Sequence, residues 1–88
     1  MLAINFSKDA EKFLRQLPPK HGRQIASKLQ QMLENPSPND SKQLRGYPYL
    51  RVDAGEYRII YFATEEILEI VLIGKRNDDE VYKRLRRK

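Results

Sequence analysis

The sequence predicts an α+β domain in which two helices pack on one face of a largely antiparallel sheet. Residues 8–34 have the apolar spacing of helices, whereas three runs after residue 48 are rich in β-branched and aromatic residues. Helices and strands segregated along the chain in this way favour α+β folds. With 88 residues, 40% of them hydrophobic and 33% charged, the chain has material for one small core. We therefore expect residues 1–88 to form a single domain.

The N-terminal part is expected to form a strand followed by a helical hairpin. Residues 2–6, LAINF, alternate between apolar and polar side chains, as a half-buried strand does. Ser7 is a good N-cap for the next segment, residues 8–17, where apolar residues recur at i, i+3, i+4 and i+7. Pro19 suits the first turn of a second helix that runs to about Glu34.

The second half of the chain has the composition of strands. Residues 35–41, NPSPNDS, are dominated by turn-forming residues and are expected to be a loop. Three β-rich runs follow at residues 49–53, 56–63 and 67–73, separated by AG and TEE. Short separators of this kind favour hairpins, so the three runs are predicted to form an antiparallel meander that completes one sheet with the N-terminal strand.

A short terminal helix is expected to begin with Asn77 as its N-cap and to place Asp78, Asp79 and Glu80 in its first turn. Residues 81–88 then contain five of the chain's 17 basic residues and none of its 12 acidic residues. Such a block attracts phosphate or an acidic partner. The ordinary alternative is a solvated helix end that stabilises the helix dipole.

The composition also argues against several classes of protein. The chain has no cysteine and a single histidine, so disulfides are impossible and a structural zinc site is improbable. No run of 18 apolar residues is present, and the N-terminus lacks the features of a signal peptide. We expect a cytoplasmic protein that is not associated with a membrane and needs no metal or other cofactor.

One predicted strand carries an arginine among apolar residues, in the stretch EYRIIYF. Alternation along the strand places Tyr57, Ile59 and Tyr61 on one face and Arg58, Ile60 and Phe62 on the other. The helical hairpin can cover only one face, so the other is either closed by the terminal helix or left as a partly apolar docking surface. A buried guanidinium needs a carboxylate, water or a bound anion. A salt bridge to Glu56, Glu69 or another acid is the ordinary explanation.

Three stretches, LRG at 44–46, GEYRIIY at 55–61 and GKRNDDEVY at 74–82, together with the opening FSKDAEKFLRQLP, resemble the RelE/ParE superfamily of toxins. Their order and spacing favour the RelE branch. The resemblance implies a RelE-like fold and a toxin that enters the ribosomal A site. There it would cleave translated mRNA by attack of a 2′-hydroxyl on the adjacent phosphodiester. It also implies a cognate, RelB-like antitoxin that inhibits the toxin, which we expect to bind through an acidic amphipathic segment.

The resemblance assigns three catalytic residues. Arg58 would hold the phosphate and its transition-state charge, Arg76 would act on the leaving-group side, and Tyr82 would stack on a base or position a proton. Further candidates for contact with RNA or phosphate are Arg51, Tyr49, Arg45, Lys75 and Lys83. Candidates for contact with the antitoxin are Ile60, Phe62 and Arg84.

The chain departs from the active RelE pattern on the strand before Arg58. Strongly cleaving members tend to have lysines seven and nine residues earlier, and this chain has Arg51 and Tyr49 there. An arginine is a poor general base because its pKa lies above about 12. Lys42, Lys75 or Glu56 are alternative bases, and orientation and charge stabilisation alone are a further possibility.

Two other functions stay open at this point. A ParE-like protein would share the fold but poison DNA gyrase, although ParE members usually lack this set of two arginines and a tyrosine. A non-catalytic relative would bind RNA or its antitoxin without cutting, and the replaced lysines favour this reading.

Overall fold

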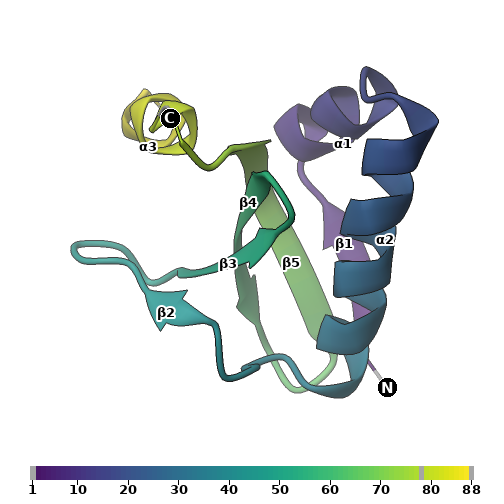
Figure 1. Ribbon diagram of the computed structural model, residues 1–88. Helices are drawn as coiled ribbons and strands as arrows, with labels where there is room; N and C mark the ends of the chain where they lie inside the picture. Colours follow the sequence, from purple (N-terminus) through teal and green to yellow (C-terminus); the bar gives the residue numbers. More distant parts are fainter. Residues whose placement is uncertain (1, 78, 88) are drawn as a thin grey trace.

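The computed structural model describes residues 2–77 and 79–87, and within them it contains a five-stranded sheet with helices on both faces (Figure 1). The elements in chain order are β1 (Ala3–Phe6), α1 (Lys8–Arg15), α2 (Pro19–Glu34), β2 (Lys42–Gln43), β3 (Leu50–Ala54), β4 (Tyr57–Ala63), β5 (Ile67–Lys75) and α3 (Glu80–Arg86). The strand order is β1-β5-β4-β3-β2, with β1 parallel to β5 and the other neighbours antiparallel. The predicted α+β class is confirmed.

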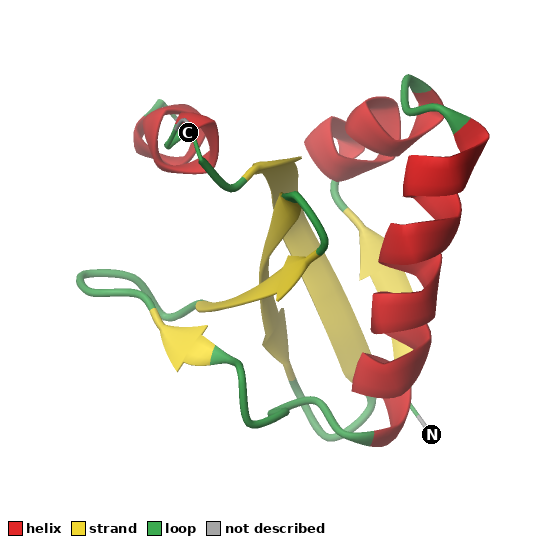
Figure 2. Cartoon of the chain, viewed as in Figure 1, coloured by secondary structure: helices red, strands yellow, loops and turns green. Residues whose placement is uncertain are grey.

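The helical hairpin covers one face of the sheet, as predicted (Figure 2). The Ser7 hydroxyl caps α1 by accepting a hydrogen bond from the Ala10 amide at 3.0 Å. The same hydroxyl donates to the Val71 carbonyl of β5 at 2.6 Å and so ties the cap to the sheet. Helix α2 begins at Pro19 and buries one stripe against the sheet, formed by Ile25, Leu29 and Met32. In the described ranges, no helix is both long and apolar enough to cross a membrane.

The turn between β3 and β4 lies one residue later than predicted. The sequence suggested a loop of Ala54 and Gly55, but Ala54 pairs with Tyr57 and the loop is Gly55–Glu56. Gly55 has a φ of +61°, and glycine is the residue that tolerates a positive φ at the first position of a two-residue hairpin loop. The shift places Asp53 directly opposite Arg58 on the same face of the sheet.

Strand β2 was not predicted, because two polar residues carry no periodic signal. Its two residues pair with β3, and the connecting loop is closed by a hydrogen bond from the Leu44 amide to the Tyr49 carbonyl at 2.9 Å. Gly46 in this loop has a φ of +84°, which glycine adopts without strain. The LRG stretch therefore begins the loop between β2 and β3, with Leu44 buried and Arg45 and Gly46 exposed at its turn.

Helix α3 closes the second face of the sheet. Val81 and Leu85 are buried against Ile60 and Leu72 in a second apolar cluster, so the terminal-helix alternative is confirmed. The predicted Asn77 cap is wrong, because the helix begins only at Glu80.

The chain bends between β5 and α3. The Arg76 amide donates to the Glu56 carbonyl at 3.0 Å, and Arg76 and Asn77 follow the strand as a bend that is not helical. Asp79 precedes the helix with a φ of 53° and no side-chain cap bond. The predicted place of Asp78 in the first turn lies outside the described residues.

The loop after α2 is held by an exposed ion pair whose effect on stability depends on pH. Lys28 Nζ lies 2.8 Å from the Asp40 carboxylate, and this hydrogen bond lowers the pKa of Asp40 below its ordinary value of 3.8. A group whose pKa is lower in the folded state stabilises the protein at pH values above its unfolded-state pKa. This stabilisation is lost as the pH falls through its folded-state pKa. Asp40 is 52% exposed, so we expect Asp40→Asn to lower the free energy of unfolding by less than about 1 kcal/mol at pH 7.

Urea unfolding at several pH values checks this expectation. The difference between Asp40→Asn and the parent protein should shrink as the pH is lowered from 7 to about 3. A difference that stays constant over this range would mean that Asp40 acts through packing of the loop and not through its charge.

Candidate functional site

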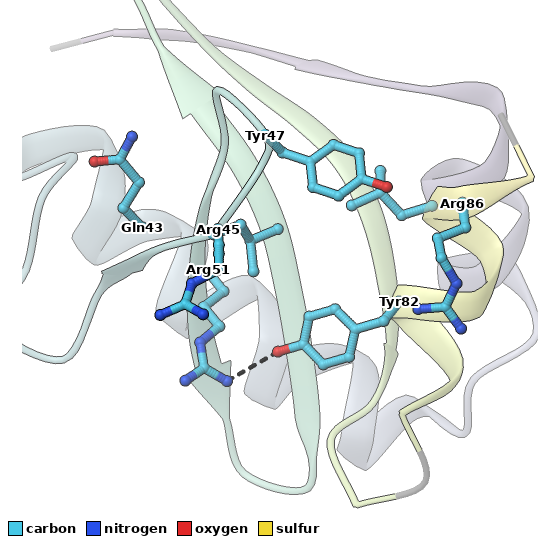
Figure 3. Close-up of a pocket in the computed structure, with 8 residues that line it drawn as sticks. Gln43, Arg45, Tyr47, Arg51, Tyr82 and Arg86 are labelled. Atoms are coloured by element: carbon cyan, nitrogen blue, oxygen red, sulfur yellow. Dashed lines mark hydrogen bonds between the residues drawn. The ribbon is translucent and has the colours of Figure 1, made fainter.

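The face of the sheet under α3 carries two arginines that converge on one tyrosine. Arg51 Nη1 from β3 and Arg58 Nη1 from β4 each donate a hydrogen bond to the Tyr82 hydroxyl of α3, both at 2.8 Å. The Arg58 guanidinium also lies 5.7 Å from the centre of the Tyr82 ring. Figure 3 shows the bond between Arg51 and Tyr82 at the edge of a pocket. Two neighbouring strands and the terminal helix thus meet at one hydroxyl group, whose two acceptor positions are both used.

An aspartate joins the cluster from the neighbouring strand. Arg58 Nε lies 2.9 Å from Asp53 Oδ1, and Arg58 Nη2 lies 3.5 Å from Oδ2. Arg76 Nη1 approaches the same carboxylate at 3.8 Å. The pairing with Asp53 raises the pKa of Arg58, so its guanidinium stays charged at any working pH. The salt bridge expected for Arg58 is present, but its partner is neither Glu56 nor Glu69.

Asp53 was not named from the sequence, although its position opposite Arg58 can be worked out from the turn. Cross-strand neighbours of opposite charge attract one another, and the residue opposite Arg58 follows from the position of the turn. Placing the loop at Gly55–Glu56 identifies Asp53 as that neighbour. The side chain is 38% exposed, compared with 15% for Arg58 and 51% for Arg76, so the carboxylate is accessible from solvent.

A pocket of about 440 Å³ opens between the β2–β3 loop and α3 (Figure 3). Its lining combines three arginines, two tyrosines, two leucines and a glutamine: Gln43, Leu44, Arg45, Tyr47, Arg51, Tyr82, Leu85 and Arg86. A smaller hollow of about 110 Å³ contains Asp53 and Arg58, and Arg51 lines both. The pocket therefore offers charged donors beside flat apolar walls, a combination that binds a planar ring with an attached anion.

Aromatic rings continue from the pocket across the sheet. Tyr47 stacks on Tyr49 with ring centres 6.1 Å apart and an angle of 11° between the planes. Tyr49 in turn stacks on Phe62 at 5.8 Å and 22°. All three side chains are half-buried, so the stack leaves part of each ring in contact with solvent.

Several predicted site residues do not join this cluster. Lys75 pairs with Tyr57, faces away from Arg58 and lines a separate hollow together with Glu56. Lys83 is exposed on α3 and does not line the pocket. Arg45 does line it, whereas Tyr49 lies beyond its rim in the aromatic stack. Strand alternation directs Lys75 away from the arginines, and helix rotation does the same for Lys83.

Two of the predicted antitoxin contacts are covered by other parts of the chain in this structure. Ile60 is 0% exposed because Val81 and Leu85 cover it, so it offers no surface while α3 is in place. Arg84 points away from the pocket toward α1, where it pairs with Asp9 and donates to the Ile73 carbonyl at 2.8 Å. It anchors α3 and is not part of an open surface. Phe62 keeps exposed area at the end of the aromatic stack.

The residues described in the structure include no group of three histidine, aspartate or glutamate side chains that could hold a metal ion. The chemistry available at the site itself comes from guanidinium groups, one carboxylate and phenol hydroxyls.

Comparison with known proteins gives a family match and several structural matches. Residues 3–80 match the family model described as the ParE toxin of the type II toxin-antitoxin system parDE. No curated protein sequence matches the chain. The isolated RelE toxin of E. coli is 27% identical, with a TM-score of 0.75 over 99% of this chain and 97% of that chain.

Two structures of toxin-antitoxin complexes are similar in fold. The RelE chain of the archaeal RelE-RelB complex from Pyrococcus horikoshii OT3 is 24% identical, with a TM-score of 0.75 over 88% of this chain and 97% of that chain. A chain of the RelBE2 complex from Mycobacterium tuberculosis is 20% identical, with a TM-score of 0.74 over 85% and 98% of the two chains. The predicted RelE-like fold is thereby confirmed.

Proposed function

The chain belongs to the ParE toxin family within the RelE/ParE superfamily and has the fold of RelE toxins, and on this basis we propose that it is a ribosome-dependent endoribonuclease. It would inhibit translation by cleaving mRNA in the ribosomal A site. We base this proposal on Arg51 and Arg58, which both donate to the Tyr82 hydroxyl beside an open pocket. We take residues 1–88 to act as one toxin domain in the cytoplasm, where translating ribosomes are found.

The pocket suits a nucleotide of single-stranded RNA. Single strands are bound by aromatic rings that stack on bases and by cations that follow the backbone. Tyr47 and Tyr82 supply rings on two sides of the pocket, and Arg45 and Arg86 supply cations at its rim (Figure 3). Double-stranded nucleic acid would not present a free base to this pocket.

The arginines suit the charges that develop during cleavage. Attack of the 2′-hydroxyl creates a pentavalent phosphorus with additional negative charge, which guanidinium groups stabilise through paired hydrogen bonds. Arg58 is held in place from two sides, by Asp53 and Tyr82, and is assigned to the phosphate. Arg76 is 51% exposed and reaches the same carboxylate, so we assign it to the leaving 5′-oxygen.

We expect a protein antitoxin as the natural inhibitor. Related toxin chains were solved in complexes with RelB antitoxins, which supports a partner of that kind. An acidic amphipathic segment would complement the arginines around the pocket and cover the apolar rings of Tyr49 and Phe62. An antitoxin that touched only the outer surface of α1 and α2 would contradict this placement.

Translation in vitro with mapping of mRNA 3′ ends tests the proposed function. Cleavage within codons that requires ribosomes supports it. Stalled translation with intact mRNA would instead indicate a non-catalytic binder, which the replacement of lysine by Arg51 and Tyr49 favours. DNA breaks that depend on gyrase would indicate a ParE-type activity. We keep this alternative because the matching family model is described as a ParE toxin.

Replacing Tyr82 with phenylalanine should separate the two roles of this residue. The change keeps the ring for stacking but removes the oxygen that accepts from Arg51 and Arg58. We expect the single-turnover rate of cleavage to fall about tenfold, since one hydrogen-bonding group is lost from the reacting centre. The affinity for the ribosome–mRNA complex should stay within about twofold, because stacking is retained.

Tyr82→Ala provides the contrast, because it removes ring and hydroxyl together and should weaken binding as well as the rate. If Tyr82→Phe cleaved as fast as the parent protein, the hydroxyl would have no part in the reaction and the residue would act by stacking alone.

A further inference from the structure

The structure places beside Arg58 a proton acceptor that was not among the bases considered from the sequence. We infer that the Asp53 carboxylate accepts the proton of the attacking 2′-hydroxyl, an inference that rests on the proposed ribonuclease function. The two positions where related toxins tend to have lysines hold Arg51, which has no acceptor, and Tyr49, which stacks between Tyr47 and Phe62. Asp53 lies two residues beyond Arg51 on the same face of β3.

Asp53 contacts Arg58, the residue that we assign to the phosphate. The carboxylate occupies the edge of the Arg58 guanidinium formed by Nε and Nη2. Nη1 uses one hydrogen on Tyr82. Each terminal nitrogen has two N–H groups and makes one of these contacts, so within the described residues one N–H on each is left for a phosphate. A phosphate bound there would share the guanidinium with Asp53, and on this basis we place the neighbouring 2′-oxygen beside the carboxylate.

The Asp53 carboxylate is exposed enough to be reached by a substrate hydroxyl. Asp53 is 38% exposed and borders the smaller hollow, which also contains Arg51 and Lys42. Among the residues that the structure describes, it is the carboxylate in contact with Arg58 and Arg76. An ionised carboxylate has several lone pairs, and two guanidinium contacts do not use all of them.

The other candidate bases fit less well. Glu56 lies in the hollow with Tyr57 and Lys75, on the opposite side from the Arg58 guanidinium. Lys42 does border the Asp53 hollow, but its ammonium group must lose a proton before it can accept one, whereas an ionised carboxylate accepts directly. Asp40 borders it too, but its carboxylate is paired with Lys28 at 2.8 Å.

The proposed step balances as follows. The 2′-hydroxyl gives its proton to an Asp53 oxygen while its own oxygen forms a bond to phosphorus. The bond from phosphorus to the 5′-oxygen breaks, and the leaving oxygen takes a proton from water. Asp53 then returns its proton to water. The products are a 2′,3′-cyclic phosphate and a 5′-hydroxyl, and no oxidant, reductant or metal enters the equation.

Chemical rescue of cleavage tests the inference. On programmed ribosomes under single-turnover conditions, Asp53→Asn and Asp53→Ala should each lose about 10²-fold in rate, the usual contribution of a general base. Formate or acetate should restore part of the rate of Asp53→Ala, and acetate should act more strongly because it is the more basic anion. Asp53→Asn should resist rescue because its amide fills the space. Glu65→Gln, which removes an exposed carboxylate between β4 and β5 at the far end of β4 from Arg58, should cleave within about twofold of the parent protein.

Each alternative outcome has a distinct meaning. Asp53 variants that cleave within threefold of the parent protein would overturn the inference and leave the proposed function standing. A loss of rate without rescue, or with equal rescue by formate and acetate, would show that Asp53 only orients Arg58, and this too would overturn it. A parent protein that does not cleave ribosome-bound mRNA would overturn both. Circular dichroism of each variant ensures that a loss of rate is not a loss of fold.

Discussion

Replacing Arg58 with alanine should lower the rate of mRNA cleavage by about 10²-fold or more and relieve growth arrest when the protein is expressed. The guanidinium is the group that we assign to the phosphate, and removing one preorganised donor to a developing oxyanion costs about 10²–10³-fold. The change also releases the Tyr82 hydroxyl and the Asp53 carboxylate, which Arg58 holds at 2.8 and 2.9 Å. Arg76→Ala should have an effect of the same order through the leaving group.

Arg58→Ala should nevertheless fold. Asp53 is 38% exposed, so water replaces the lost ion pair, and the larger apolar core lies on the other face of the sheet. Arg58→Lys is an informative intermediate, because it keeps the charge but loses the paired donors that fit a phosphate. Arg15→Ala is the matched control, since Arg15 is a 70% exposed arginine on α1.

Growth on induction and single-turnover cleavage measure the effect of Arg58→Ala. If Arg58→Ala and Arg76→Ala both stayed fully toxic, the arginine cluster would not be the active site.

Replacing Gly74 with valine should release α3 from the sheet and abolish activity without unfolding the rest of the protein. A Cβ atom at Gly74 would lie 2.6 Å from the Val81 side chain and 3.1 Å from Arg84 Nη1. Val81 is 0% exposed and has no room to move aside, and overpacking of this kind costs about 1–3 kcal/mol. A helix of seven residues does not persist alone in water, so α3 should fray once it is displaced.

Tyr82 would then leave Arg51 and Arg58, and we expect cleavage to fall by at least about 10²-fold. Limited trypsin digestion should cut the basic C-terminal segment at least tenfold faster, while thermal unfolding of the larger core shifts little. Gly22→Ala is the control, because a Cβ there meets nothing within 4 Å. Trypsin cleavage at the rate of the parent protein would show that α3 tolerates the added side chain.

The secondary structure could be predicted from the sequence because its signals are local. The Ser7 cap, the apolar spacing of α1 and α2, and the alternation of β4 each depend on neighbours a few residues away. Strand β2 escaped prediction because it is defined by its backbone pairing with β3 and not by its own side chains. The start of α3 escaped prediction because Asp79 precedes the helix with a φ of 53° and no side-chain cap bond, so no capping residue marks it.

Within the candidate site, prediction succeeded in grouping some residues and failed for others. Arg51, Arg58 and Tyr82 were named from sequence and lie together. Lys75 was named as well, yet it lies opposite Tyr57 and not Arg58, and successive strand residues project to opposite faces. Whether a named residue belongs to the site thus depended on register, which composition does not reveal.

Periodicity and the cost of burying charge act within a single segment. The α+β class, the two faces of β4 and the need of Arg58 for a counter-charge could therefore be inferred from the sequence alone. The identity of the counter-charge, Asp53, and the burial of Ile60 under α3 became clear only from the folded chain. Both outcomes follow from pairings between segments. A turn displaced by one residue changes every cross-strand neighbour, and a helix docked on a sheet converts an apolar surface into core.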